Sequence, residues 1–356
     1  MAKLGGMSEQ PLIFDLGKRP PTTRALALQI REHGDAALDQ AQRRADAARY
    51  QEVTCKSALN AVKGMPFKWT LNPYRGCTHG CHYCFARRYQ TQLELGPDDH
   101  FSTVILVKVN LVDVLRRELD KSAWAREQVA VGTATDPYQP IEGHYKLTRR
   151  SLEALLAGRT PIGLVTKGPM VVRDADILAD IGRRYGCTVY VSVPTVDDEA
   201  WRTLEPGTAP PLQRLRAVRQ LRDAGVNAGV LMAPVVPGFT TQPSKLEATI
   251  KAIADHGAAF MGANLMYLKE GTRDHFMGFL AREFPDMVTS YNRLYAGAYA
   301  SADYVKTVRG MIDTLQQRYE VRGRRHRNEE SVPDQPADAA IEEKAAPEQA
   351  AFGWEE

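Results

Sequence analysis

The sequence predicts an α/β protein built as a parallel barrel, or partial barrel, of six strand–helix units. Between about Lys68 and Tyr319, short β-branched runs alternate with longer amphipathic segments, which is the pattern of repeated βα units. Several of the predicted helices end in glycine, as helices commonly do. The 356 residues, 44% of them hydrophobic, are enough to bury a sizeable core.

The six strands and the helices between them follow in a regular order. Strands are expected near residues 69–74, 129–136, 162–167, 189–194, 228–234 and 260–267. The intervening helices are expected over residues 81–95, 147–157, 175–185, 211–224 and 244–256, and the last two show the three-and-four apolar spacing of helices packed on a sheet. Residues 103–119 add an extra strand and helix between the first and second units. In such a barrel the chemistry lies on loops at the carboxyl ends of the strands.

Both ends of the chain differ in composition from the predicted barrel. We assign residues 1–54 to an N-terminal extension that is partly helical or mobile, residues 55–321 to the core, and residues 322–356 to a disordered acidic tail. From Arg327 onward the chain has two basic and nine acidic residues, so the remainder has 44 basic against 34 acidic residues, a net charge of +10. This mildly basic body is compatible with an anionic substrate or nucleic acid, and equally with scattered solvated side chains.

The composition also predicts the compartment. No window is apolar enough to span a membrane, and the first 21 residues lack the apolar run of a signal peptide. The five cysteines, three clustered and two isolated (Cys55 and Cys187), do not form the pattern of a disulfide framework. We therefore expect a cytoplasmic protein that does not enter a membrane.

The clustered cysteines are Cys77, Cys81 and Cys84, in the loop that directly follows the first predicted strand. Three thiolates at this spacing can converge on one centre, and soft sulfur ligands favour iron clusters, zinc or copper(I). Structural zinc requires four ligands, a set that His79 or His82 could complete. An iron–sulfur cube held by three cysteines instead leaves one iron open to another ligand.

The segment NPYRGCTHGCHYCFAR (72–87), followed by βα units, resembles the radical S-adenosylmethionine (SAM) superfamily, and its context is similar to the subgroup of spore photoproduct lyase. The resemblance covers residues 55 to 320 and implies a partial (βα)6 barrel of the TIM type. It also implies that Cys77, Cys81 and Cys84 bind a 4Fe–4S cluster whose open iron chelates SAM. Reductive cleavage of SAM would then yield a 5′-deoxyadenosyl radical that abstracts a hydrogen atom from an unidentified substrate.

The resemblance further implies which residues surround SAM. Tyr83 would pack on the adenine, and backbone groups at Phe85 would contact the adenine edge. Near the end of the second strand, Thr133, Thr135 and Asp136 offer oxygens for the amino group of SAM, although Asp136 with the following proline is also a common way to start a turn.

Lys167 and Ser192 match in position a lysine and a serine that meet SAM in the resembled subgroup. Lys167 would complement the SAM carboxylate as a point charge. The alternative is a lysine at the barrel rim that extends its ammonium group to solvent. Glu205 is expected to form an ion pair with Arg214 or Arg216 at the start of the helix over residues 211–224, or to form a surface cap.

The predicted function is a lyase-like radical SAM enzyme, reduced by a reductase, a flavodoxin or a ferredoxin, with nucleic acid as one candidate substrate. Two alternatives are a spore-photoproduct-type DNA lesion repair lyase and a non-enzymatic, metal-stabilised nucleic-acid-binding module. The resembled lyase has a hydrogen-donating cysteine near the end of its second strand. Residues 129–136 contain none, and Tyr138 is the candidate donor, because Cys187 is expected to face the helices rather than the barrel interior.

Overall fold

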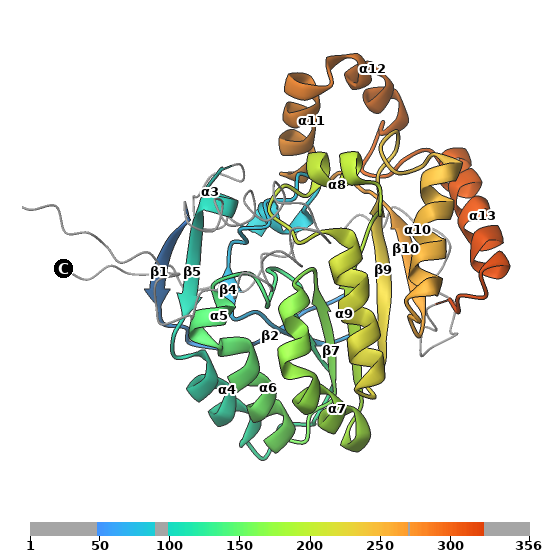
Figure 1. Ribbon diagram of the computed structural model, residues 1–356. Helices are drawn as coiled ribbons and strands as arrows, with labels where there is room; N and C mark the ends of the chain where they lie inside the picture. The colour runs from blue at the N-terminus through green and yellow to red at the C-terminus, as the bar shows by residue number, and fades with distance from the viewer. Residues whose placement is uncertain (1–47, 90–98, 270, 324–356) are drawn as a thin grey trace, which may run out of the picture. The chain divides into compact units, whose positions relative to one another are not determined.

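The computed structural model describes residues 48–89, 99–269 and 271–323 (Figure 1). Most of the predicted extension and nearly all of the predicted tail lie outside these residues. Residues 90–95 of the helix predicted over 81–95 also lie outside them.

The main sheet has seven strands in the order β10-β9-β8-β7-β6-β3-β2. Neighbours from β3 to β10 are parallel and follow chain order, whereas β2 pairs antiparallel with β3 at the edge. Among the described strands β10 and β3 do not pair, so the barrel is partial, which confirms the predicted fold class. The strands are β2 (Leu59–Ala61), β3 (Trp69–Leu71), β6 (Val129–Val131), β7 (Ile162–Thr166), β8 (Cys187–Ser192), β9 (Ala228–Val235) and β10 (Met261–Leu265).

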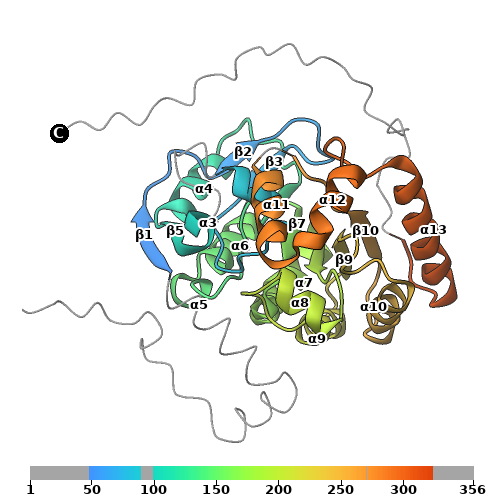
Figure 2. The same ribbon diagram turned by 90° about the horizontal axis from the view of Figure 1, so that it is seen from above.

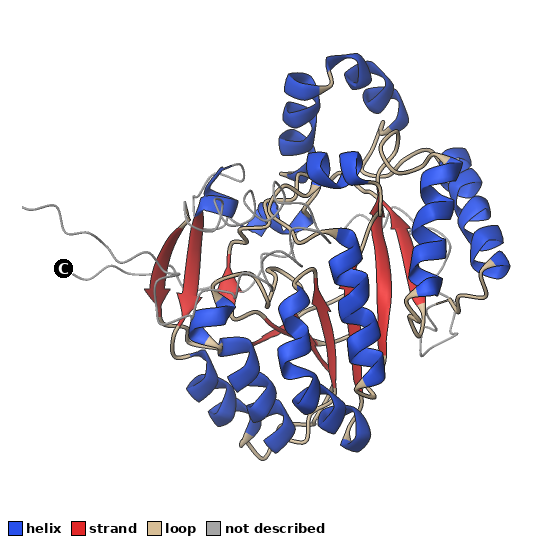
Figure 3. Ribbon diagram, in the orientation of Figure 1, coloured by secondary structure: helices blue, strands red, loops and turns tan. Residues whose placement is uncertain are grey.

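Helices cover the outer face of this sheet (Figures 1 and 3). Their apolar sides and the sheet together bury one large hydrophobic core. The four helices predicted after the first unit are confirmed with ends shifted by no more than one residue. The covering helices are α4 (Leu111–Leu119), α6 (Leu147–Ala157), α7 (Ala175–Arg184), α9 (Pro211–Asp223), α10 (Pro243–Asp255) and α13 (Ala302–Arg318).

A second, three-stranded sheet has the order β1-β5-β4. Its strands are β1 (Arg49–Val53), β5 (Val104–Lys108) and β4 (Tyr74–Arg75). Strand β5 and helix α4 confirm the extra strand and helix predicted within 103–119. Strand β1 falls in the segment assigned to the extension, and it pairs in parallel with β5 along its whole length.

Short helices gather at the carboxyl ends of the strands, where α11 lies above the barrel in Figure 2. Helix α11 stacks Phe279 on His82, with 4.0 Å between ring centroids. No helix in the described part of the chain is long and apolar enough to cross a membrane. The remaining helices are η1 (Phe85–Tyr89), α3 (Asp99–Thr103), α5 (Glu142–Tyr145), η3 (Pro169–Asp174), α8 (Asp198–Leu204), α11 (Thr272–Glu283) and α12 (Pro285–Leu294).

The first predicted unit differs most from the structure. The strand expected over 69–74 breaks after Leu71, because Pro73 has no N–H for a ladder and Asn72 turns its side chain to accept from the backbone N–H of Ala134 at 2.8 Å. The helix expected from residue 81 is a short 3₁₀ helix that begins at Phe85. The residues before it form a loop held by other elements.

Candidate functional site

The loop that carries the three cysteines, residues 76–84, is anchored by backbone hydrogen bonds to three other segments. The N–H of Cys77 donates to Phe101 O at 2.9 Å, and the N–H of His82 donates to Leu204 O at 3.0 Å. From the other side, the N–H of Gly207 donates to His79 O at 3.0 Å. The loop is therefore fixed without regular secondary structure of its own.

Glycine is required where this loop begins. Gly76 has a φ of +83°, and a Cβ there would lie 2.5 Å from the carbonyl oxygen of Val104 in β5. A side chain would be strained by the backbone conformation and would also clash with a strand. The close approach of the loop to β5 thus depends on the absence of a side chain.

Buried polar side chains complete the support of the loop. Gln139 accepts from the N–H of Thr78 at 3.2 Å and donates to Gly76 O at 3.3 Å. The guanidinium group of Arg87 is 2% exposed and donates to the carbonyl oxygens of Gly80 and Cys81 at 2.8 and 3.1 Å. These bonds hold the backbone on both sides of the cysteines.

The three cysteines pack near one another, because Cys84 lies against both the cluster that contains Cys77 and the cluster that contains Cys81. Burial raises the pKa of Cys81 and Cys84, and the neighbouring thiol groups raise both values further. The positive charge of Lys167 opposes this effect and lowers the pKa of both residues. Among the described residues, no three His, Cys, Asp or Glu side chains stand close enough together to ligate one metal ion.

Lys167 follows β7 and meets Ser192 at the end of β8. Its Nζ donates to Ser192 Oγ at 3.0 Å and lies 5.6 Å from the centre of the Tyr83 ring. Burial acts to lower the pKa of Lys167, but Cys81 and Glu205 outweigh burial and leave the pKa above its ordinary value. The ammonium group therefore stays charged, with 17% of the side chain exposed. The structure brings together the Tyr83, Lys167 and Ser192 side chains that the sequence analysis singled out.

Glu205 lies at the centre of this group. Tyr83 donates its hydroxyl hydrogen to Glu205 Oε1, and Lys167 Nζ lies 3.7 Å from the same oxygen. Arg214 binds the other oxygen, Oε2, at 2.5 Å. Burial alone would raise the pKa of Glu205, but Arg214 and Lys167 lower it below the ordinary value. The expected ion pair with Arg214 is confirmed, and it is buried rather than a surface cap.

Asp136 is also close to the cysteine loop, and its carboxylate is already engaged. It accepts from Thr166 Oγ1 and Lys167 N, both at 2.6 Å, and lies 3.4 Å from His79 Nδ1. Burial opposes ionisation of Asp136, yet His79 and the hydrogen bonds lower its pKa to about 2. Asp136 thereby ties the end of β7 to the cysteine loop, and its expected contact with SAM stays a prediction.

The other predicted SAM-binding residues surround the same loop. Thr135 is buried and donates to Gly76 O at 2.6 Å, while Thr133 is half-buried and accepts from Asn72 at 3.3 Å. Phe85 begins η1, and the residue is 37% exposed. Their roles toward SAM stay predictions.

Comparison with known proteins identifies the family of the chain that carries this loop. A family model described as the radical SAM superfamily matches residues 71–253, which run from the last residue of β3 through the cysteine loop and past β9. The chain belongs to the radical SAM superfamily. It is a radical SAM enzyme, and its helices α11 to α13 follow the matched residues in the chain.

Relatives of this radical SAM enzyme occur in bacteria and in a phage. An uncharacterized protein of Mycobacterium tuberculosis is 39% identical over 282 residues, which cover 78% of this chain and 83% of that relative. A radical SAM Nalpha-GlyT isomerase of Pseudomonas phage M6 is 29% identical over 171 residues, 48% of this chain and 33% of the isomerase.

The radical SAM core also has the fold of a solved enzyme. A spore photoproduct lyase variant with bound AdoMet and dinucleoside spore photoproduct matches with a TM-score of 0.60 and 15% identity, over 79% of this chain and 82% of that structure. At this level of identity the likeness shows a shared fold.

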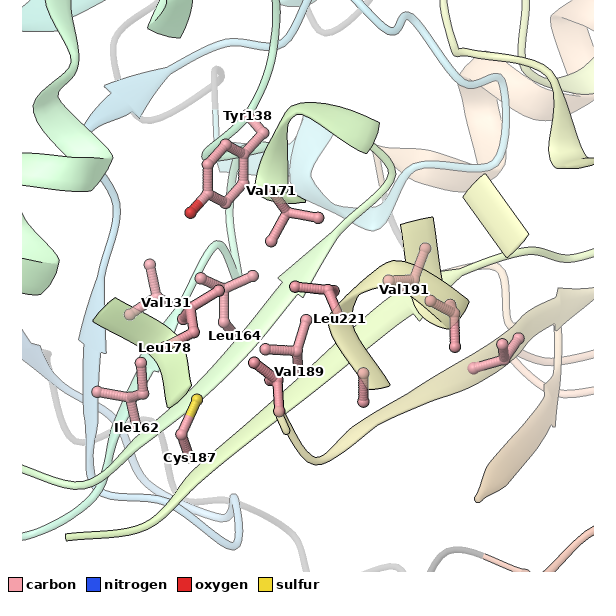
Figure 4. Packing of buried hydrophobic residues seen from close by; sticks show 14 of the residues in the cluster. Val131, Tyr138, Ile162, Leu164, Val171, Leu178, Cys187, Val189, Val191 and Leu221 are labelled. Atoms are coloured by element: carbon pink, nitrogen blue, oxygen red, sulfur yellow. The ribbon is translucent and has the colours of Figure 1, made fainter. Parts of the chain in front are cut away.

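The candidate hydrogen donor Tyr138 lies in the core packing of the radical SAM fold (Figure 4). Its hydroxyl group donates to Asp174 Oδ2 at 2.9 Å. Burial raises the pKa of Tyr138 well above its ordinary value, and Asp174 raises it further. Its role as a donor stays a prediction.

The two isolated cysteines lie away from the cysteine loop. Cys187 faces α7, because a Cβ on Gly182 of that helix would lie 3.6 Å from Cys187 Cβ (Figure 4). The prediction that Cys187 faces the helices is thus confirmed. The backbone N–H of Cys55 donates to Asn110 Oδ1 at 2.8 Å, next to β5.

Sequence reasoning missed two supports of the radical SAM site. The sequence analysis gave Glu205 only as a member of an ion pair or a surface cap, and no expectation placed Gln139 beside the cysteine loop. Both are buried beside the loop. A glutamate before Pro-Gly reads as a turn residue, so only the pairing with Arg214 gave a signal for Glu205.

Proposed function

We propose that the chain binds a 4Fe–4S cluster through Cys77, Cys81 and Cys84 and uses it to cleave SAM reductively, in order to abstract hydrogen from a substrate yet to be identified. The observation that carries this proposal is that Lys167, which follows β7, and Ser192, at the end of β8, meet beside the ring of Tyr83 in the cysteine loop. An ammonium group, a hydroxyl group and an aromatic ring match the carboxylate and adenine of SAM.

The residues present fit such a cluster. The donor set is three buried or half-buried thiols, and Cys84 packs against the clusters that contain Cys77 and Cys81. Each thiol would bind a different iron of the cluster, so the three need not meet at one ion. The buried hydroxyl group of Thr78, beside Cys77, has no hydrogen-bond partner within the described residues. When bound, the cluster supplies the electron that splits the SAM sulfonium into methionine and a 5′-deoxyadenosyl radical, which requires the reducing end of the iron–sulfur range.

The surrounding side chains hold SAM in place. The charged Lys167 would bind its carboxylate, with Ser192 orienting the ammonium group. The Tyr83 ring would pack against the adenine. Helix α11 lies over His82 and would limit the access of water to the radical.

The test is anaerobic reconstitution with iron and sulfide, followed by SAM and dithionite. We expect 5′-deoxyadenosine from the wild-type protein and none from Cys84→Ala, with Cys187→Ala as the matched control that retains the activity. A brown, reconstituted wild-type protein that forms no 5′-deoxyadenosine would contradict the proposal. An electron donor of the flavodoxin, ferredoxin or reductase type would replace dithionite in the cell.

We further propose a nucleoside or nucleic acid as the substrate class to be tested first. The fold likeness to a lyase solved with a dinucleoside, and the +10 charge of the chain before Arg327, support it. The test supplies deuterated DNA with and without thymine damage and follows deuterium into 5′-deoxyadenosine. Transfer from other deuterated cell components, and none from DNA, would contradict this substrate class.

A further inference from the structure

We infer that Glu205 positions the side chains at both ends of the proposed SAM site, because a single oxygen of its carboxylate anchors Tyr83 and faces Lys167. This inference rests on the proposed function, in which Tyr83 meets the adenine and Lys167 meets the carboxylate. Glu205 itself would touch neither group. It is a positioning residue that acts through these two side chains.

The backbone around Glu205 is fixed, so its carboxylate has a defined place. The N–H of Glu205 donates to Trp201 O at 2.8 Å, which caps the end of α8. Its carbonyl oxygen accepts from the N–H of Thr208 at 3.1 Å and from the Thr208 hydroxyl group at 3.0 Å. Two residues later, Gly207 bonds to the cysteine loop. The segment that carries Glu205 is therefore hydrogen-bonded directly to the cysteine loop.

The two carboxylate oxygens of Glu205 have different partners. Oε2 is bound by the fully buried Arg214, which also donates to Ser192 O at 2.8 Å. Oε1 faces the site, where it accepts from Tyr83 and lies near Lys167. A buried carboxylate needs such partners to remain charged, and Arg214 supplies the pairing that is independent of SAM.

Tyr83 and Lys167 share one oxygen of Glu205, so a change at this oxygen affects both ends of the proposed SAM site. The hydrogen bond fixes the rotation of the Tyr83 ring, and the ammonium group of Lys167 lies over that ring at a cation–π distance. Lys167 is closer to Ser192, at 3.0 Å, than to Glu205, at 3.7 Å. It is thus held in place by Glu205 yet remains able to bind a ligand carboxylate.

The test compares Glu205→Gln with the wild type, both reconstituted without oxygen. The amide keeps the size of the side chain and removes the charge. We expect SAM affinity, measured by equilibrium dialysis, to fall about ten- to a hundredfold, as for the loss of hydrogen bonds to a charged group. The iron content should equal that of the wild type, while the change that SAM causes in the EPR spectrum of the reduced protein should require more SAM.

The matched control is Glu199→Gln, an exposed glutamate in the first turn of the same helix, α8. It should bind SAM as the wild type does. Wild-type affinity in Glu205→Gln would overturn the inference and leave the proposed function standing. Failure of the wild type to bind SAM would overturn the proposed function, and the inference with it.

If Glu205→Gln does not fold, a second measurement of SAM affinity tests the same inference in variants that keep Glu205. Tyr83→Phe and Lys167→Met each leave Glu205 paired with Arg214. If they act through the shared oxygen, the double variant should lose less affinity than the product of the two single losses, by about threefold or more. Losses that multiply independently would contradict the positioning role.

Discussion

Arg214 and Glu205 form an ion pair from which solvent is excluded on both sides, with 2.5 Å between Nη2 and Oε2. The pair joins the start of α9 to the loop that contacts the cysteines. Removing one member of a buried pair leaves the other charge without a partner, which is far more costly than losing a surface pair.

We therefore expect Arg214→Ala to destabilise the protein by about 3–5 kcal/mol. Urea unfolding under anaerobic conditions measures the effect. The control is Arg184→Ala, which removes an exposed pair with Asp180 at 3.0 Å and should cost no more than about 0.5 kcal/mol. Equal losses in both variants would show that the Glu205 pair does not stabilise the fold.

We expect the three cysteines of the loop to be required for iron binding and Cys187 not to be required. Replacing Cys77, Cys81 or Cys84 by alanine should abolish iron retention after reconstitution. Cys187→Ala should retain the wild-type iron content and visible absorbance, because this thiol packs between β8 and α7. Iron retained in all three loop variants would refute the assignment of the ligands.

Gly207 should be essential for the cysteine loop. A Cβ at this position would lie 2.3 Å from Thr78 O and 2.9 Å from His79 O, both of them backbone atoms. We expect Gly207→Ala to cost about 1–3 kcal/mol and to lower iron content, because the loop must shift away. Gly310→Ala is the control, since nothing lies within 4 Å of the added Cβ in α13 and the helix should gain about 0.5–1 kcal/mol. Unchanged iron content in Gly207→Ala would show that the loop tolerates the shift.

Asp197 should stabilise α8 in a pH-dependent way. Its carboxylate accepts from the N–H of Ala200 at 2.9 Å as an N-cap and pairs with Lys245 at 3.0 Å. Burial acts to raise the pKa of Asp197, but these partners lower it below the ordinary 3.8. Asp197→Ala should therefore cost about 1 kcal/mol at neutral pH. Because the folded-state pKa is the lower one, this difference is complete above pH 3.8 and disappears as the pH falls through the folded-state value.

Unfolding of the wild type and Asp197→Ala at a series of pH values checks this dependence. Asp198→Ala, at the next, exposed position, is the control and should change stability little at any pH. A difference that is the same at pH 7 and at pH 2 would show that the charge of Asp197 makes no contribution.

The regular part of the fold follows from local patterns in the sequence. Strands β7 to β10 and helices α6 to α10 lie close to their predicted bounds, apart from α8, which was not predicted. In these units apolar spacing, glycine stops and the alternation of strand and helix agree. The first unit was predicted poorly, because Asn72 and the cysteine loop take their conformation from partners distant in sequence.

The residues of the candidate site also fall into those that could be predicted from the sequence and those that could not. The cysteines, Lys167 and Ser192 carry a motif or an unusual position at a strand end, so they could be found by reading the chain. Glu205 and Gln139 act only because tertiary packing buries them beside the loop, and no local pattern encodes that burial. For Asp136, the residue type was recognised, but its pairing with His79 and β7 could not be read from spacing.

The pairing of β1 with β5 has a practical consequence for anyone shortening this protein. The family match begins at residue 71, which invites a truncation that discards Arg49–Val53. That cut would strip β5 of its outer neighbour and expose a row of unsatisfied amides and carbonyls, on the same strand that braces Gly76. Such a shortened protein would be prone to edge-to-edge aggregation through β5, directly beside its cysteines. Any truncated form of the protein should therefore retain Arg49–Val53.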